Sequence, residues 1–207
     1  MSIDEQGKKY GRGDKTKGVR KPAQGRGQEG TDPREAETRP RKGFSLAFSG
    51  WDEVDLRLGS IADAGFEGIE PTFNEGAVPS PGDYTKSAAE LRTRVEDLGL
   101  IIPSMRGGRT PWTSIPSPDA AERQRAVDHT RRAFECLGLM GGRTLLVVPG
   151  QIDPSISYLD HWKRVVDYAR AVGEIAEEFD TVVGLENVEA RFPLSVREWA
   201  QLIDEID

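Results

Sequence analysis

The sequence predicts an α/β fold in which parallel strands alternate with helices across residues 43–207. Short apolar runs alternate there with stretches whose apolar residues recur every three to four positions, which is typical of βα units and a parallel sheet. One run, residues 144–149 (TLLVVP), is almost wholly apolar, as expected of a strand buried on both faces. Together these observations indicate five consecutive βα units.

The first three units place strands at residues 44–48, 68–73 and 100–105. Ser117 followed by Pro118 predicts the start of the third helix, with the serine at the N-cap and the proline at the first helical position. Each helix has an apolar face with a helical period, formed in turn by Val54, Leu58, Ile61 and Ala62, by Ala88, Leu91, Val95 and Leu98, and by Val127, Thr130, Phe134 and Leu137.

The last two units place strands at residues 144–149 and 181–186. The helix between them has one apolar stripe, formed by Tyr158, Trp162, Val165, Ala169, Val172, Ala176 and Phe179. Ser195 and Glu198, three residues apart, form a capping box that predicts the start of the fifth helix. The apolar residues of that helix are Trp199, Leu202, Ile203 and Ile206.

Five parallel strands fit either the first part of a β/α barrel or a doubly wound open sheet. A closed barrel of eight units needs about 250 residues, more than residues 43–207 provide. The first strand–helix turn, residues 49–52 (SGWD), lacks a glycine-rich phosphate-binding fingerprint. The number of units therefore leaves both folds open.

Residues 1–42 differ in composition from the rest of the chain. They hold 12 of the 28 Lys and Arg residues, 7 of the 35 Asp and Glu residues, and almost no large apolar side chain. Such a segment cannot bury enough surface to offset an ordering cost of about 1–2 kcal/mol per residue, so we predict a disordered basic tail. A basic arm for nucleic acid is a weaker hypothesis, because acidic residues interrupt the basic ones and Tyr10 is the only aromatic residue. A start codon assigned upstream of the true domain is a third interpretation.

Residues 43–207 carry 16 basic and 28 acidic side chains, which argues against broad binding to a phosphate backbone. The only cysteine, Cys136, excludes an internal disulfide and falls in a helical pattern, where we expect a small buried residue. No apolar run approaches the roughly 18 residues of a membrane span, and no apolar segment follows the basic N-terminus as in a secretory signal. We therefore expect a cytoplasmic protein, compatible with a soluble enzyme that has a small-molecule substrate.

Two carboxylates end strands that are otherwise apolar. Glu70 ends the second strand and Glu186 ends the fifth. Functional groups of parallel β/α folds gather at the carboxyl ends of the strands, and a carboxylate is costly to bury there without a partner or a metal ion. Both are candidate ligands or bases; the alternative is pairing with a neighbouring arginine at the barrel mouth.

Two arginines, Arg106 and Arg109, flank Gly107 and Gly108 after the third strand, and Trp112 follows. Guanidinium groups beside flexible backbone N–H groups can bind a phosphate or a carboxylate. The alternative is an ordinary solvated glycine loop with surface arginines.

The remaining polar candidates are weaker. Gln151 follows the fourth strand, where its amide could lie beside a substrate hydroxyl. His129 and His161 both fall within predicted helices rather than at strand ends, so we interpret them as helix residues. No Ser-His-Asp set, paired-cysteine zinc spacing or Walker loop is present in the sequence.

Several motifs resemble one family in their order and spacing. Residues 64–70 (AGFEGIE) resemble the second-strand signature of the sugar isomerase/epimerase superfamily, the xylose isomerase-like TIM barrels. Residues 102–105 (IPSM) resemble the third strand of its ketose-phosphate 3-epimerase branch. Residues 145–150 (LLVVPG), 184–187 (GLEN) and 192–195 (FPLS) are similar to the fourth and fifth units. The resemblance implies a partial TIM barrel over residues 43–207.

The resemblance also implies a chemistry. Glu186 is similar to a strand-five glutamate that binds a divalent ion, Mn²⁺, Mg²⁺ or Co²⁺, and serves as catalytic acid or base. In that chemistry the metal polarises the substrate carbonyl and stabilises the enediolate formed when a glutamate removes the neighbouring proton. Glu70 matches a glutamate at the substrate pocket of the family, and we expect Arg106, Arg109, Trp112 and Gln151 to bind the same ketose or ketose phosphate.

The family draws its other metal ligands from strands six to eight, whereas this sequence ends at Asp207 in the fifth predicted helix. We therefore expect a C-terminally truncated isomerase or epimerase that shows no activity alone. One alternative is a split enzyme, completed by another chain or by self-association through the open barrel edges. Others are a binding or assembly module without activity and an inosose-type dehydratase, a lyase. A DNA-repair endonuclease of the same barrel is disfavoured, because such enzymes use several histidines at strand ends.

Overall fold

The structure is a computed structural model that describes residues 42–188 and 191–206. These residues belong to one compact unit, Pro40–Asp207. The tail predicted for residues 1–42 lies outside the described residues, apart from Lys42. No helix in the described ranges is both long and apolar enough to cross a membrane. The cytoplasmic location stays a prediction.

Strands and helices alternate along the described chain as the sequence predicts. The order is β1 (Gly43–Ser45), α2 (Trp51–Asp63), β2 (Gly68–Glu70), α3 (Tyr84–Asp97), β3 (Ser104–Arg106), α4 (Arg109–Ser114), α5 (Ala120–Leu139), β4 (Thr144–Val147), α6 (Tyr158–Glu178), β5 (Val182–Leu185) and α7 (Val196–Ile206). The strands are shorter than predicted, and α4 is an addition that the sequence analysis did not anticipate.

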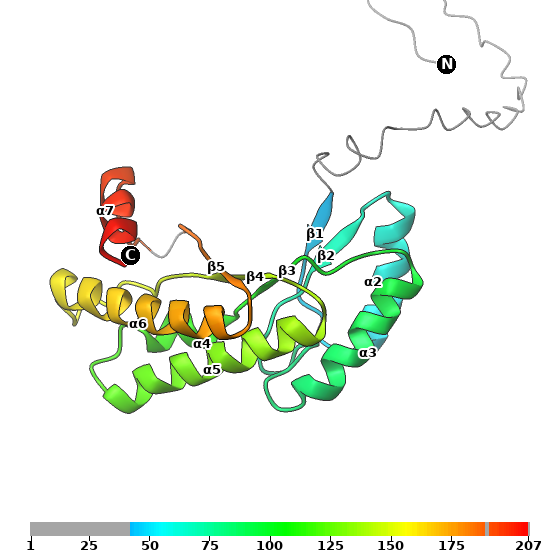
Figure 1. Cartoon of the computed structure of the whole chain (residues 1–207), viewed down its shortest axis with the longest axis horizontal. Helices are drawn as coiled ribbons and strands as arrows, with labels where there is room; N and C mark the ends of the chain where they lie inside the picture. Colours follow the sequence, from blue (N-terminus) through cyan, green and yellow to red (C-terminus); the bar gives the residue numbers. More distant parts are fainter. Residues whose placement is uncertain (1–41, 189–190, 207) are drawn as a thin grey trace, which may run out of the picture. The chain divides into compact units, whose positions relative to one another are not determined.

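The strands lie side by side in sequence order, which favours a barrel over a doubly wound sheet. β1 pairs with β2, and β4 pairs with both β3 and β5, all in parallel. Parallel bridges from Gly68 to Ile101 and from Thr72 to Arg106 join β2 to β3. A doubly wound sheet reverses its strand order at a switch point, and no reversal occurs among these five strands. Figure 1 shows them in succession, with α3, α5 and α6 following one another along the sheet.

The core lies between the sheet and the helices. Ile69, Met105 and Leu145, one from each of three neighbouring strands, are fully buried. They belong to one cluster with the apolar faces of the helices, represented by Leu91, Val95, Phe134, Leu137, Val165 and Val172. Each such side chain contributes about 1.5–3 kcal/mol on full burial. Cys136 is buried in the same cluster, as predicted, and burial raises the pKa of its thiol.

The opposite face of the sheet carries a polar layer, with Leu146 and Val148 beyond it toward the carboxyl ends of the strands. Side chains alternate along a strand, so the neighbours of the buried residues point to the inner side. The strand register aligns Ser45 with Glu70, and Ser104 with Thr144. Barrel interiors are usually packed with Val, Ile and Leu, so this polar layer indicates an interior suited to polar contacts.

The start of α5 differs from the prediction. Its N-cap is Asp119, whose carboxylate accepts a hydrogen bond from the backbone N–H of Ala121 at 2.8 Å. The hydroxyl of Ser117 accepts a hydrogen bond from the backbone N–H of Asp119 instead. The prediction of Ser117 at the N-cap was wrong because Asp119, two residues later, caps the helix.

The capping box of α7 is confirmed in most respects. The hydroxyl of Ser195 accepts a hydrogen bond from the backbone N–H of Glu198 at 3.3 Å. The carboxylate of Glu198 reaches back to accept hydrogen bonds from the backbone N–H of Leu194, at 2.8 Å, and from the hydroxyl of Ser195. The reciprocal contact therefore reaches Leu194, one residue earlier than a standard box places it.

Candidate functional site

A cavity of about 350 Å³ opens at the carboxyl ends of β2 to β5. Thr72 and Arg106 line it at the ends of β2 and β3, and Val148 and Glu186 line it beyond β4 and β5. Arg109 and Trp112 contribute from α4. Four of the six predicted site residues, Arg106, Arg109, Trp112 and Glu186, therefore share one cavity at the end of the sheet where the fold class places chemistry.

Glu186 is positioned by the pairing of β5 with β4. Its backbone N–H donates to the carbonyl of Val147 at 3.0 Å, which continues the ladder past Leu185. The side chain is exposed. Within residues 42–188 and 191–206 its carboxylate has no hydrogen-bond or ion-pair partner, so the alternative of pairing with a neighbouring arginine is not realised there.

The glycines between Arg106 and Arg109 are held in place. The backbone N–H of Gly107 donates to the carbonyl of Leu146 at 2.8 Å. Gly108 has φ 79°, and a Cβ at this position would clash with the carbonyl oxygen of Phe73. Only glycine fits such a left-handed position packed against backbone. The loop is therefore anchored, unlike the freely solvated loop of the alternative interpretation.

A buried histidine supports this loop, a role that its helical position in the sequence does not predict. His129 is 2% exposed on α5, as its predicted helical position allows, and its Nε2 lies 2.8 Å from the carbonyl oxygen of Gly107. Burial lowers the pKa of His129, so the ring is neutral near pH 7 and its Nε2–H donates to that carbonyl. The sequence signal that could have found it is a histidine on the buried face of an amphipathic helix, where it needs a partner.

Two hydrogen-bond donors of the cavity residues lack an acceptor. Nε of Arg106 and Nε1 of Trp112 are buried, and neither has a partner among the described residues. The guanidinium carbon of Arg109 lies 5.8 Å from the ring centre of Trp112, within range of a cation–π contact. This edge of the cavity thus combines two cationic groups with unused N–H donors.

Glu70 and Gln151 lie outside this cavity. The carboxylate of Glu70 accepts hydrogen bonds from the hydroxyls of Ser45, at 2.8 Å, and Ser104, at 2.6 Å. It stands one layer below Thr72 on the same face of the sheet, because alternate residues of a strand share a face. Gln151 lines a separate cavity of about 740 Å³, while its backbone N–H donates to the carbonyl of Trp112. Contact of either side chain with a substrate stays a prediction.

The described residues do not by themselves fit a divalent ion. No group of three or more His, Cys, Asp or Glu side chains able to hold a metal occurs in residues 42–188 and 191–206. Glu186 is the only acidic residue that lines the cavity in this part of the chain. Magnesium and similar hard ions need about six oxygen ligands, so one carboxylate is insufficient.

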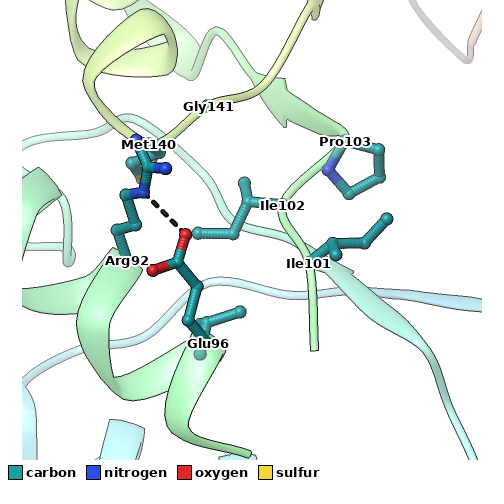
Figure 2. A pocket seen from close by; sticks show the side chains of 8 residues that line it. Arg92, Glu96, Ile101, Ile102, Pro103, Met140 and Gly141 are labelled. Atoms are coloured by element: carbon teal, nitrogen blue, oxygen red, sulfur yellow. Dashed lines mark hydrogen bonds and ion pairs between the residues drawn. The ribbon is translucent and has the colours of Figure 1, made fainter. Parts of the chain in front are cut away.

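Another pocket, smaller than both cavities described above, lies at the other end of the sheet. Figure 2 shows Arg92 and Glu96 of α3 pointing toward one another there, joined by an ion pair of 2.7 Å. Ile101 and Pro103, which precede β3, also line this pocket of about 210 Å³. It contains none of the predicted site residues and lies at the amino end of β3, so it is not the candidate site.

The comparisons with known proteins agree with the fold. A family described as xylose isomerase-like TIM barrel matches residues 58–207. An L-ribulose 3-epimerase structure is 23% identical over 81% of this chain and 57% of that one, with a TM-score of 0.66. The structure of the 3-keto-D-glucoside 4-epimerase YcjR from E. coli is 20% identical over 82% of this chain and 65% of that one, with a TM-score of 0.65.

The structure of D-psicose 3-epimerase from Clostridium cellulolyticum H10 is 17% identical over 81% of this chain and 60% of that one, with a TM-score of 0.63. The chain thus spans less than two thirds of the length of each of these three structures. Among curated proteins, none matches the chain. Identities this low support a shared fold.

Proposed function

The chain belongs to the xylose isomerase-like TIM barrel family, and from that premise we propose that it supplies the first five βα units of a sugar isomerase or epimerase. The substrate would be a ketose or a ketose phosphate bound at the carboxyl ends of the strands. The observation that carries the proposal is the cavity that Glu186, whose carboxylate has no partner in the described chain, lines together with Arg106 and Trp112. The epimerases among the structural neighbours act on ketoses by their names, which supports this substrate class.

Glu186 is the proposed acid and base. A carboxylate at this position takes the proton from the carbon beside the substrate carbonyl, which leaves an enediolate. Return of a proton to the neighbouring carbon gives an isomer, and delivery from the other face gives an epimer. An exposed carboxylate without a competing partner can take the proton and return it on its own face, whereas delivery from the other face needs a second acid.

The resemblance to the family implies a divalent ion, Mn²⁺, Mg²⁺ or Co²⁺, which would supply electrophilic activation of the carbonyl. Because the described residues place one carboxylate in the cavity, the other ligands would have to come from outside the described ranges, 42–188 and 191–206. We assign no step of the reaction to such an ion.

The sheet leaves room for further βα units. Within the described ranges, β1 pairs only with β2 and β5 pairs only with β4. The free edge of each strand presents backbone donors and acceptors that another strand can use. We propose that additional βα units join at these edges, so that the cavity gains a wall opposite Arg106.

Deuterium exchange tests this function. The 207-residue chain is incubated in D₂O with L-ribulose or D-fructose and Mn²⁺, alone and together with the part of the L-ribulose 3-epimerase chain that lies outside the match. We expect no exchange with the chain alone, since a single carboxylate cannot hold the ion. In the mixture we expect deuterium to enter at the carbon beside the carbonyl, and Glu186→Gln to abolish its entry.

Light scattering establishes whether the two polypeptides associate. A mixture that associates but exchanges no deuterium would contradict the isomerase proposal. Deuterium exchange that persists undiminished in Glu186→Gln would contradict only the role of Glu186, and would leave the isomerase proposal standing.

A further inference from the structure

We propose that the cavity binds a ligand through an anionic group, a phosphate or a carboxylate, and that Arg106, Arg109 and Trp112 form the subsite for it. We call these three residues the anion subsite. That the ligand is a sugar rests on the proposed function, whereas the presence of the anion subsite rests on the geometry of the cavity.

Two N–H donors of the anion subsite lack a hydrogen-bond acceptor in the described chain. Nε of Arg106 and Nε1 of Trp112 are both buried, and the described residues offer neither an acceptor. Buried N–H groups in native proteins are nearly always paired, because an unpaired one forfeits its hydration without compensation. Both residues line the same cavity, so a side-chain rotation that turns either donor toward the cavity would let an oxygen-rich ligand there accept its hydrogen bond.

The charges of the cavity favour an anion. Neither Arg106 nor Arg109 forms an ion pair among residues 42–188 and 191–206, although residues 43–207 contain 28 acidic and 16 basic side chains. Other arginines of the described chain do pair, for example Arg131 with Glu178 and Arg143 with Asp180. Two guanidinium groups that line one cavity without a carboxylate partner can bind a ligand that brings its own negative charge.

The subsite is held in position before any ligand binds. Gly107 is fixed by the carbonyl of Leu146 through its N–H and by Nε2 of His129 through its carbonyl. Gly108 packs against the backbone of Phe73. Donors that are already placed lose less conformational freedom on binding, which increases affinity.

The arrangement also sets the direction of the ligand. The anion subsite lies at the end of β3 and on α4, whereas Glu186 follows β5, with β4 between them. A cavity of about 350 Å³ suits a small ligand such as a sugar phosphate. A sugar whose anionic end lies at Arg106 therefore presents its opposite end to Glu186, where the carbonyl would be.

Calorimetric titration of the 207-residue chain at low salt tests the anion subsite. The probes are D-fructose, D-fructose 6-phosphate, D-fructuronate and inorganic phosphate. We expect the phosphorylated or the carboxylated sugar to bind on the order of tenfold or more tightly than D-fructose, and the tighter of the two identifies the anionic group. Inorganic phosphate should compete with that sugar.

The variants are Arg106→Met, which keeps the aliphatic stem, and Trp112→Phe, which keeps an aromatic ring without the N–H. Each should lower the affinity for the anionic sugar by more than it lowers the affinity for D-fructose, and so remove most of the preference for the anionic sugar. The matched control is Arg143→Met, which removes the same charge from an exposed ion pair at the amino end of β4. It should leave all four affinities unchanged.

Equal affinity of the wild-type chain for the neutral and anionic sugars would overturn the anion subsite and leave the proposed function standing. An anionic preference that survives both variants would overturn the assignment of its residues. Phosphate binding that depends on Arg106, in a protein whose associated mixture exchanges no deuterium, would support the anion subsite and contradict the proposed function. If Arg106→Met does not fold, two measurements still test the anion subsite. They are the affinities of the wild-type chain for the neutral and anionic sugars, and the same affinities in Trp112→Phe.

Discussion

Two buried histidines hold the loops that follow β3 and β4. His129 donates to the carbonyl of Gly107 in the β3 loop. His161, on α6, is fully buried beside Gly150, where a Cβ would lie 3.5 Å from its Nε2, and its ring centre is 4.3 Å from that of Phe192. Neither ring nitrogen of His161 meets a partner in good hydrogen-bond geometry among the described residues, although the backbone of Pro149 is close enough to oppose the lowering of its pKa by burial. One histidine therefore acts through a hydrogen bond and the other through packing.

The pH dependence of stability follows from these two residues. Burial lowers the pKa of both below the ordinary value of 6.5. Well above pH 6.5 both rings are neutral in the folded and unfolded states, so they cause no pH dependence there. Below pH 6.5 the unfolded chain takes up protons that the folded chain does not, so the free energy of unfolding should fall as the pH is lowered.

His161→Leu separates packing from hydrogen bonding. At pH 7.5 it should change the free energy of unfolding by less than about 1 kcal/mol, because no hydrogen bond is lost, and it should reduce the fall in stability toward pH 5. His129→Leu, the matched variant, should lose about 1–3 kcal/mol at pH 7.5 because the carbonyl of Gly107 loses its donor. Urea unfolding at several pH values measures both. Equal losses in the two variants would contradict the distinction.

The residues that follow the strands were predictable from the sequence. The side chains that form hydrogen bonds to them or to their loops were not. Glu186, Arg106 and Trp112 could be found because each follows an apolar run at a position that the fold class assigns to chemistry. The pairing of Ser45 and Ser104 with Glu70 depends on the register of three strands, which separate motifs do not fix. The role of His129 depends on where α5 packs.

Among the elements, α4 and the start of α5 differ from the expectation. The sequence of α4, RTPWTS, contains threonines, a serine and a proline, which have weak helix propensity. Pro111 lies in the first turn, where its missing N–H costs no intrahelical hydrogen bond. Six residues are too few for a helical period to be recognised, so tertiary packing decides this element.

The cap of α5 can be tested by a pair of substitutions. Asp119→Ala removes the side chain that accepts from the N–H of Ala121, and should cost about 1 kcal/mol of unfolding free energy. Ser117→Ala, at the position predicted from sequence, should cost less, because it removes only a 3.2 Å contact before the helix. Urea unfolding compares the two. A larger loss for Ser117→Ala would return the N-cap to the predicted residue.

For the whole molecule, the alternation of strands and helices predicted the parallel sheet, and the strand order then distinguished the barrel from the open sheet. The sequence could not decide this point, because five units suit both folds. The same order leaves one edge of β1 and one edge of β5 without a partner strand in the described chain. These edges are where the cavity would be extended.

The edge of β5 should promote association. Val182 is 55% exposed on β5, and an exposed edge strand pairs readily with another chain. We expect sedimentation equilibrium of the wild-type chain to show mass increasing with concentration, and Val182→Lys to reduce that increase. The control Leu56→Lys changes another exposed residue, on α2 away from the strand edges, and should have no effect. A strictly monomeric wild-type chain would contradict this expectation.

The most direct test of the central claim is a nuclear magnetic resonance titration of the ¹⁵N-labelled 207-residue chain with D-fructose 6-phosphate. The indole N–H of Trp112 has no acceptor in the described chain, whereas that of Trp162 donates to Glu205 at 2.7 Å. If the cavity is the sugar site, the Trp112 indole signal and the amide of Gly107 should shift together, and the Trp162 signal should not move. Shifts confined to Arg92 and Gly141, at the amino-end pocket, or no shifts in the folded protein, would contradict the account.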